Sequence, residues 1–213
     1  DNSAQMMFDV MVPIIGRATE LAASPDNRIK IVSCRLISKY VDTAHVHHVK
    51  QLAPVALNQA KLLLSEAKKQ NKTEVTRASY NLVAAVADRL TTDFTPYFPE
   101  WVEILKEDLA HYAVGVYNHA SQTLSQIAMA VGKETFRPHM KTFMQLAERS
   151  MIVEEDHSVQ SSGIYFFASM CELLGAETAE VIPSFIPFLI NVIKNTQIYD
   201  LVTVKNKFNV GKE

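Results

Sequence analysis

Five prolines recur along the chain at nearly equal intervals. They are separated by 41, 42, 42 and 45 residues and fall at Pro13, Pro54, Pro96, Pro138 and Pro183. An apolar pair follows each of the first four at the eighth and ninth positions beyond the proline. Two-helix units of about 40 to 47 residues are typical of HEAT and armadillo arrays, whereas tetratricopeptide and ankyrin units run to about 33 or 34. The sequence therefore predicts an all-α fold, a HEAT-repeat α-solenoid with a period of about 42 residues.

Each period contains two apolar stripes separated by a polar turn. In the second unit, apolar residues recur at helical spacing from Pro54 to Ala67, and the polar run 68–72 then interrupts them. Thr73 is the expected N-cap of a second helix. We call the two helices of a unit its A helix and its B helix. The B helices are expected at 28–41, 73–90, 116–131 and 159–174, and Gly132 and Gly175 are expected to cap two of them.

A two-helix unit buries its apolar face only against its neighbours, so the array is predicted to form one domain, 1–213. The predicted repeats cover 5–47, 48–91, 92–133, 134–178 and, in part, 179–198, and 199–213 is expected to be a loop or the start of a further repeat. The chain begins without methionine, and its first repeat starts with the apolar residues Met6, Met7, Phe8, Val10 and Met11, where a terminal repeat would need a polar face. We therefore expect a segment cut from a longer array.

Composition excludes several classes of function. The chain has only six glycines and a formal net charge of −2, without a long run of either sign, so no direct nucleic-acid binding is expected. Cys34 and Cys171 lie far apart in apolar helical stretches, which favours reduced thiols in the cytoplasm or nucleus. The most apolar run, 181–193, is shorter than the roughly 20 residues that span a bilayer and contains two prolines, so no membrane association is expected.

Motifs of catalysis are missing from the sequence. It lacks a glycine-rich phosphate loop, a His-Glu-x-x-His helix, a Cys-x-x-Cys pair and a Gly-x-Ser-x-Gly elbow. The sequence therefore predicts neither an enzyme nor a cofactor. The cluster His45-Val46-His47-His48, preceded by Asp42, has metal-ligand residue types. It lies at an expected solvent-exposed junction and a closed site would need a further ligand, so we expect no metal there.

Binding is expected on the surface, because the concave wall is where solenoids usually bind their partners. Polar stripes lie opposite the core stripes of three B helices. Amides, hydroxyls and carboxylates on successive helices can hold an extended peptide by its backbone and lysine side chains. The alternative is an ordinary solvated face, because exposed polar residues need no function. The partner-binding candidates are Glu74, Arg77, Asn81, Asp88, Asn118, Gln122, Ser125, Ser158, Ser162, Tyr165, Ser169 and Glu172.

Three stretches carry a resemblance to a known family: 125–136 followed by 144–146, 168–175 followed by 181–183, and 87–98 with its ending Asp-Phe-Thr-Pro-Tyr-Phe. They are similar to stretches of the importin-β (karyopherin) superfamily, and most closely to its large import receptors for ribosomal proteins and core histones. The similarity covers about residues 75–193 and consists mostly of general HEAT features.

The resemblance implies a nuclear transport receptor of the cytoplasm and nucleus. Such a receptor binds protein cargo with a basic import signal on its concave B-helix wall and releases it when Ran-GTP binds, mainly to repeats outside this segment. The chain departs from the pattern in one respect: its only acidic run is 154–156, whereas receptors for strongly basic cargo carry several.

A HEAT scaffold or adaptor without a transport role remains the alternative, such as a phosphatase regulatory subunit, a tubulin-binding array or an assembly chaperone. A tubulin-binding array would present Trp or basic residues on its inter-helix turns. Here the single tryptophan, Trp101, lies inside an expected A helix, and the turns at 24–27 and 71–74 are largely polar.

Overall fold

The computed structural model describes residues 2–111, 116–151, 157–180 and 182–195, and these segments are helical apart from short turns. The predicted all-α fold is thus confirmed. No helix within these ranges is both long and apolar enough to cross a lipid bilayer. The α-helices and the two 3₁₀ helices are, in chain order, α1 (Asn2–Leu21), α2 (Asn27–Thr43), α3 (Val46–Lys69), α4 (Thr73–Leu90), η1 (Thr91–Tyr97), α5 (Phe98–Ala110), α6 (Val116–Val131), α7 (Lys133–Met151), α8 (His157–Leu174), η2 (Gly175–Glu180) and α9 (Ile182–Asn195).

The chain forms two compact units, 1–175 and 176–213. The first contains α1 to α8, and α9 belongs to the second, where Phe185 is buried. The repeat boundaries inferred from the sequence stay a prediction, and 199–213 lies outside the described residues.

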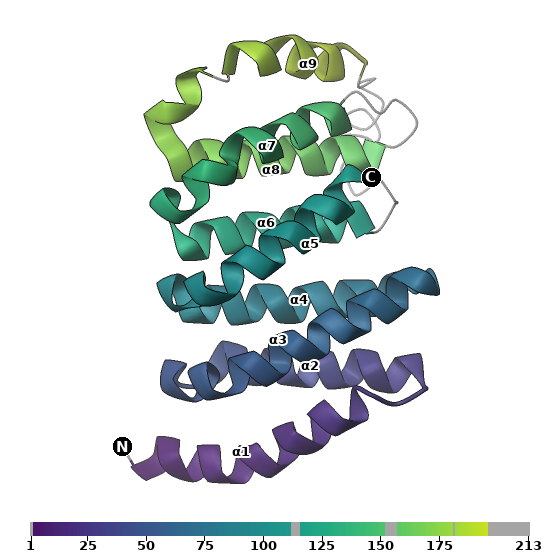
Figure 1. The fold of residues 1–213 in the computed structure, drawn as a ribbon, viewed down its shortest axis with the longest axis vertical. Coiled ribbons are helices and arrows are strands. Elements are labelled where there is room, and N and C mark those ends of the chain that lie inside the picture. Colours follow the sequence, from purple (N-terminus) through teal and green to yellow (C-terminus); the bar gives the residue numbers. More distant parts are fainter. Residues whose placement is uncertain (1, 112–115, 152–156, 181, 196–213) are drawn as a thin grey trace, which may run out of the picture. The chain divides into compact units, whose positions relative to one another are not determined.

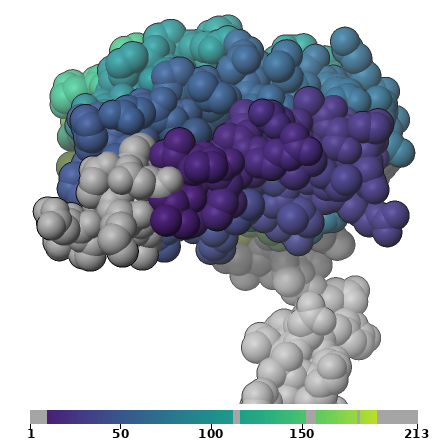
Figure 2. All heavy atoms as spheres, turned by 90° about the horizontal axis from the view of Figure 1, so that it is seen from below, coloured from purple at the N-terminus to yellow at the C-terminus, as the bar shows by residue number. Residues whose placement is uncertain are grey.

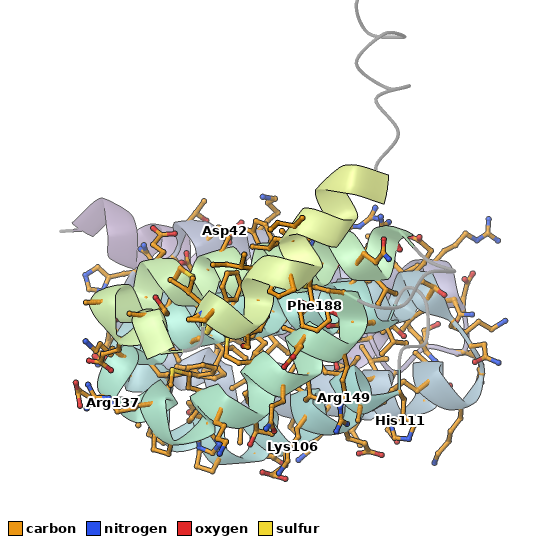
Figure 3. All side chains as sticks on the ribbon, turned by 90° about the horizontal axis from the view of Figure 1, so that it is seen from above. Asp42, Lys106, His111, Arg137, Arg149 and Phe188 are labelled. Carbon is orange, nitrogen blue, oxygen red and sulfur yellow. The ribbon has the colours of Figure 1, made fainter. Side chains whose placement is uncertain are left out.

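Helices of the first unit are arranged in two layers. In one layer α2, α4, α6 and α8 pack side by side, and in the other α1, α3, α5 and α7 each pack on the helix that follows (Figure 1). We call these the B layer and the A layer. Asp42 of α2 lies on one side of the stack, and Lys106 of α5 and Arg137 of α7 lie on the other (Figure 3). The two layers therefore present separate surfaces to a partner.

Sequence patterns located the B helices better than the A helices. α6 has the predicted bounds, and the two expected cap glycines adopt left-handed backbone, with φ of +80° at Gly132 and +56° at Gly175. Pro54, however, lies inside α3, which begins at Val46. A proline in a helix interior removes one backbone hydrogen bond and bends the helix. α1, which contains Pro13 in its interior, is visibly bent (Figure 1).

Neighbouring repeats are also joined by charged side chains. The ammonium group of Lys30 on α2 is buried and donates to Glu66 Oε2 on α3 over 2.7 Å. The hydrogen bond from Lys30 lowers the pKa of the Glu66 carboxyl. The ammonium group of Lys61 on α3 likewise contacts Glu100 of α5, at 2.6 Å. Each interaction links helices of successive repeats.

Arg89 of α4 caps the C-terminal end of α2, and replacing it should destabilise the helical stack. From α4, its Nε and Nη2 donate to the carbonyl of Ala44, the C-cap of α2, over 2.9 and 2.5 Å. Hydrogen bonds from charged groups contribute about 1.5 to 3 kcal/mol when buried. Because Arg89 is half-buried, Arg89→Ala should lower the free energy of unfolding in urea by about 1.5 kcal/mol. Arg77→Ala, which removes an exposed pair within α4, should cost less than about 0.5 kcal/mol. Equal losses for the two variants would contradict this role.

Candidate partner-binding wall

Hydrogen bonds between neighbouring B helices fix how their residues line up. The Thr123 hydroxyl of α6 donates to the Tyr80 carbonyl of α4 over 3.4 Å, and the partners are 43 residues apart. The Ser121 hydroxyl of α6 donates to the Ser162 carbonyl of α8 over 3.2 Å, across 41 residues. In these two hydrogen bonds the partners are 43 residues apart between α4 and α6, and 41 residues apart between α6 and α8.

Two rows of exposed residues run across α4, α6 and α8. The members of a row lie at the same distance from the last residue of their helices (Leu90, Val131 and Leu174), nine residues before it in one row and two residues before it in the other, and all are exposed. We call them the amide row (Asn81, Gln122 and Tyr165) and the carboxylate row (Asp88, Met129 and Glu172). The sequence identified five of these six residues but missed Met129, which is 45% exposed. The spacing itself was the signal that could have found it.

The carboxylate row contains two acidic groups that are available to a partner. In the part of the chain that the structure describes, neither Asp88 nor Glu172 has an ion-pair partner, and both are exposed. Glu74, by contrast, forms an ion pair with Arg77 one turn along α4. A basic ligand would therefore gain new ion pairs at Asp88 and Glu172, whereas at Glu74 it would have to displace Arg77.

Beside the Glu74–Arg77 pair lies His119 of α6. Its half-buried imidazole has a pKa below the usual value because burial and then the charge of Arg77 disfavour protonation, and Glu74 only partly opposes them. Its Nδ1 is buried and has no hydrogen-bond partner. This end of the wall thus carries little net charge near neutral pH.

Asn118 ties α6 to α8. Its amide nitrogen donates to the Ser158 hydroxyl over 2.9 Å, and its carbonyl oxygen accepts from the Ser162 hydroxyl over 2.9 Å. The structure therefore brings these three candidates together, but as an interhelical network. Their role in partner binding stays a proposal, and their visible role is to hold α6 against α8.

Two other candidate serines use their hydroxyl groups within their own helices. Ser125 is buried and donates to the Ser121 carbonyl, and Ser169 donates to the Tyr165 carbonyl. Ser125 therefore does not reach the surface, and the proposals below do not include it. In the aromatic run of α8, Tyr165 is 59% exposed while Phe166 and Phe167 are buried, so Tyr165 alone of the three presents its ring to solvent.

The histidine cluster forms the start of α3. His45 is the N-cap, and its Nδ1 accepts from the backbone N–H of His47 over 3.3 Å. The His48 ring centroid is 6.2 Å from that of His45 and 5.9 Å from that of His47. Among the described residues, no three His, Cys, Asp or Glu side chains converge as metal ligands would. The observed role of the cluster is therefore structural, with His45 capping the N-terminus of α3.

Apolar pockets lie at the α1 end of the stack, which faces the viewer in Figure 2. One of about 600 Å³ is lined by residues of α1 and α3 with Tyr40, and one of about 660 Å³ by residues of α1 and α2. Exposed Ile29, Val32 and Leu36 of α2 belong to the second pocket. None of the residues that line these two pockets belongs to the amide or carboxylate rows.

Comparison with known proteins agrees with the importin-like features of the sequence. No protein-family model matches the chain. Importin subunit beta-3 of Saccharomyces cerevisiae is 24% identical over 145 residues, which are 65% of this chain and 13% of that protein. A crystal structure of importin beta superposes with a TM-score of 0.75 and 17% identity, covering 88% of this chain and 25% of that one. Kap121p bound to Nup53p superposes with a TM-score of 0.73 and 18% identity, covering 92% of this chain and 18% of that one.

The helical stack thus matches the HEAT-repeat structures of importin beta and Kap121p, as the predicted HEAT-repeat fold requires. The predicted resemblance to the importin-β (karyopherin) superfamily is confirmed, at a low sequence identity. The chain spans only 13 to 25% of these relatives, so the activity of a whole receptor does not transfer to it directly.

Proposed function

We propose that this chain is part of an importin-β-like nuclear transport receptor and that its B-layer wall binds an extended basic segment of a protein cargo. The observation that carries the proposal is the carboxylate row, in which Asp88 and Glu172 lie two residues before the ends of α4 and α8, without ion-pair partners among the described residues. Carboxylates in this arrangement can pair with lysine or arginine at two points along a peptide.

Helix packing supports the B layer as the binding side. Neighbouring B helices pack closely along their lengths, whereas neighbouring A helices contact each other little. A stack whose layers differ in this way is expected to curve toward the more closely packed layer, which places the B helices on the concave wall. Structures of Kap121p bound to Pho4p and to the extreme C-terminus of Cdc14p support protein segments as the kind of partner.

We place the receptor in the cytoplasm and nucleus, and we propose that Ran-GTP releases its cargo. In this proposal Ran binds mainly to repeats outside the present chain. A HEAT scaffold without a transport role would lack such Ran-dependent release. Direct binding of nucleic acid or membrane is not part of the proposed function.

Removing the two carboxylates should weaken binding of a lysine-rich peptide. Exposed ion pairs contribute about 0.2 to 1 kcal/mol each, so the double variant Asp88→Ala/Glu172→Ala should raise the Kd about tenfold at low salt. A higher salt concentration should bring the Kd of the double variant closer to that of the unchanged protein, because salt screens exposed ion pairs. The Kd is measured by fluorescence anisotropy of the labelled peptide. The control is Glu103→Ala, which removes an exposed carboxylate of α5 in the A layer and should leave the Kd unchanged.

Ran-GTP provides the second arm of this experiment, with the full-length protein that contains the chain. Release of the bound peptide by Ran-GTP supports the transport receptor. Peptide binding that Ran-GTP does not alter would contradict regulated release. No binding of either the peptide or Ran-GTP would overturn the transport function and leave the scaffold.

A further inference from the structure

We propose that Met129 makes the wall selective for a segment in which an apolar residue stands midway between two basic residues, with the pattern basic-x-x-apolar-x-x-basic. The inference rests on the proposed function and adds the sequence pattern of the ligand. Met129 is here a specificity-determining residue at the centre of the carboxylate row.

The position of Met129 gives the first argument. It is 45% exposed on α6, and it lies two residues before the last residue of its helix, as Asp88 does on α4 and Glu172 does on α8. α6 contains no Asp, Glu, Lys or Arg, and its exposed residues are Gln122, Gln126 and Met129. Met129, at the centre of the row, thus presents a flexible, polarisable thioether that adapts to apolar side chains. Asp88 and Glu172, at the two ends, present negative charges.

Spacing gives the second argument. Packed helices lie about 8 to 10 Å apart. A peptide in polyproline II conformation rises about 3.1 Å per residue with three residues per turn, so every third side chain points the same way and recurs about every 9 Å. A peptide that crosses the B helices in this conformation therefore directs residues i, i+3 and i+6 to α4, α6 and α8. These residues meet Asp88, Met129 and Glu172 in turn.

The binding free energy is expected to differ among peptides with leucine, serine or lysine at the central position. A leucine over Met129 removes apolar surface of both side chains from water, which favours binding. A serine gains little there. A lysine at the centre finds no carboxylate in contact, since those of Asp88 and Glu172 lie about one helix spacing away, close to the screening length of about 10 Å at 0.1 M salt. The central position should therefore prefer an apolar residue to a basic one.

Three labelled peptides test the pattern. Each has two lysines separated by five residues in a background of Ala, Ser and Gly, and the middle residue is Leu, Ser or Lys. With the unchanged protein, the Leu peptide should bind about fivefold more tightly than the other two in fluorescence anisotropy. With Met129→Glu the order should reverse, so that the Lys peptide binds most tightly. Leu62→Glu, which adds the same charge on an exposed position of α3 in the A layer, should keep the original order.

The outcomes separate this inference from the function on which it rests. If all three peptides bind equally to the unchanged protein and to Met129→Glu, while Asp88→Ala/Glu172→Ala weakens all of them, Met129 does not determine specificity and the cargo-binding wall stands. If no peptide binds and the carboxylate variants change nothing, both proposals fall. Circular dichroism melting of each variant shows that it is folded, which the exposure of Met129 and Leu62 leads us to expect.

Discussion

Asp108→Ala is expected to lower the free energy of unfolding by about 3 kcal/mol. Asp108 lies on α5 and is 5% exposed, at a point where three helices meet. Its Oδ1 accepts from the ammonium group of Lys68 on α3 over 2.6 Å, and its Oδ2 accepts from the Tyr80 hydroxyl of α4. One buried carboxylate thus holds together helices of two successive repeats.

In the variant, Lys68 and Tyr80 each lose the hydrogen bond to Asp108, but the cost in free energy of unfolding differs between them. Tyr80 is fully buried, and leaving its hydroxyl without an acceptor costs about 1 to 3 kcal/mol. Burial first, and then the charge of Asp108, raises the pKa of Tyr80 well above its usual value, so the phenol stays protonated and remains a donor. The Lys68 side chain is 29% exposed, so water replaces part of its lost ion pair, and the total stays near the lower end of the range for buried pairs, about 3 to 5 kcal/mol.

Urea unfolding followed by the fluorescence of Trp101 measures this loss. The matched control is Glu103→Ala on the same helix, because Glu103 pairs with Lys106 over 3.3 Å at an exposed site and should cost less than about 0.5 kcal/mol. Tyr80→Phe removes only the hydroxyl and should cost about 1 kcal/mol. If Asp108→Ala cost no more than Glu103→Ala, the buried network would not stabilise the stack.

The B helices could be predicted from the sequence because their ends carry local signals. Gly132 follows α6 and adopts the left-handed backbone that glycine favours, so the end of the helix is visible in the chain itself. The start of α3 could not be predicted in the same way. A proline is usually taken to mark a first turn, but Pro54 lies well inside α3, which runs from Val46 to Lys69.

The rows of the candidate wall illustrate a similar limit. Helical periodicity places Asn81, Asp88 and Tyr165 on polar faces, and the structure exposes all three. Periodicity within one helix does not say which residues of different helices meet, because that register depends on packing between segments about 42 residues apart. For the same reason, the buried contact of Asp108 with Tyr80 could not be predicted from the sequence. Ser125 was also predicted to be a partner-binding residue, although packing between helices buries it.

Gly163 marks a close approach of α8 to α7, and Gly163→Ala is expected to destabilise the protein although alanine favours helices. A Cβ at this position would overlap Ser150 Oγ and lie 3.1 Å from the Ala147 carbonyl oxygen. Ser150 cannot turn away freely, because it is buried and its hydroxyl donates to that carbonyl over 2.7 Å. Overpacking of this kind costs about 1 to 3 kcal/mol, against a gain of up to about 1 kcal/mol in helix propensity. We expect a net loss of about 2 kcal/mol in urea unfolding once the Ser150 hydrogen bond is also broken.

Gly16→Ala is the matched control, since Gly16 also lies within a helix, α1, and a Cβ there would meet nothing within 4 Å. This variant should stabilise the protein by about 0.5 to 1 kcal/mol through helix propensity alone. The two identical substitutions are thus expected to have opposite signs, which separates close packing from propensity. Adding Ser150→Ala to Gly163→Ala removes the overlapping oxygen and should recover part of the loss. A stabilising Gly163→Ala would show that α7 and α8 can move apart at little cost, and that Gly163 does not hold the spacing between these two helices.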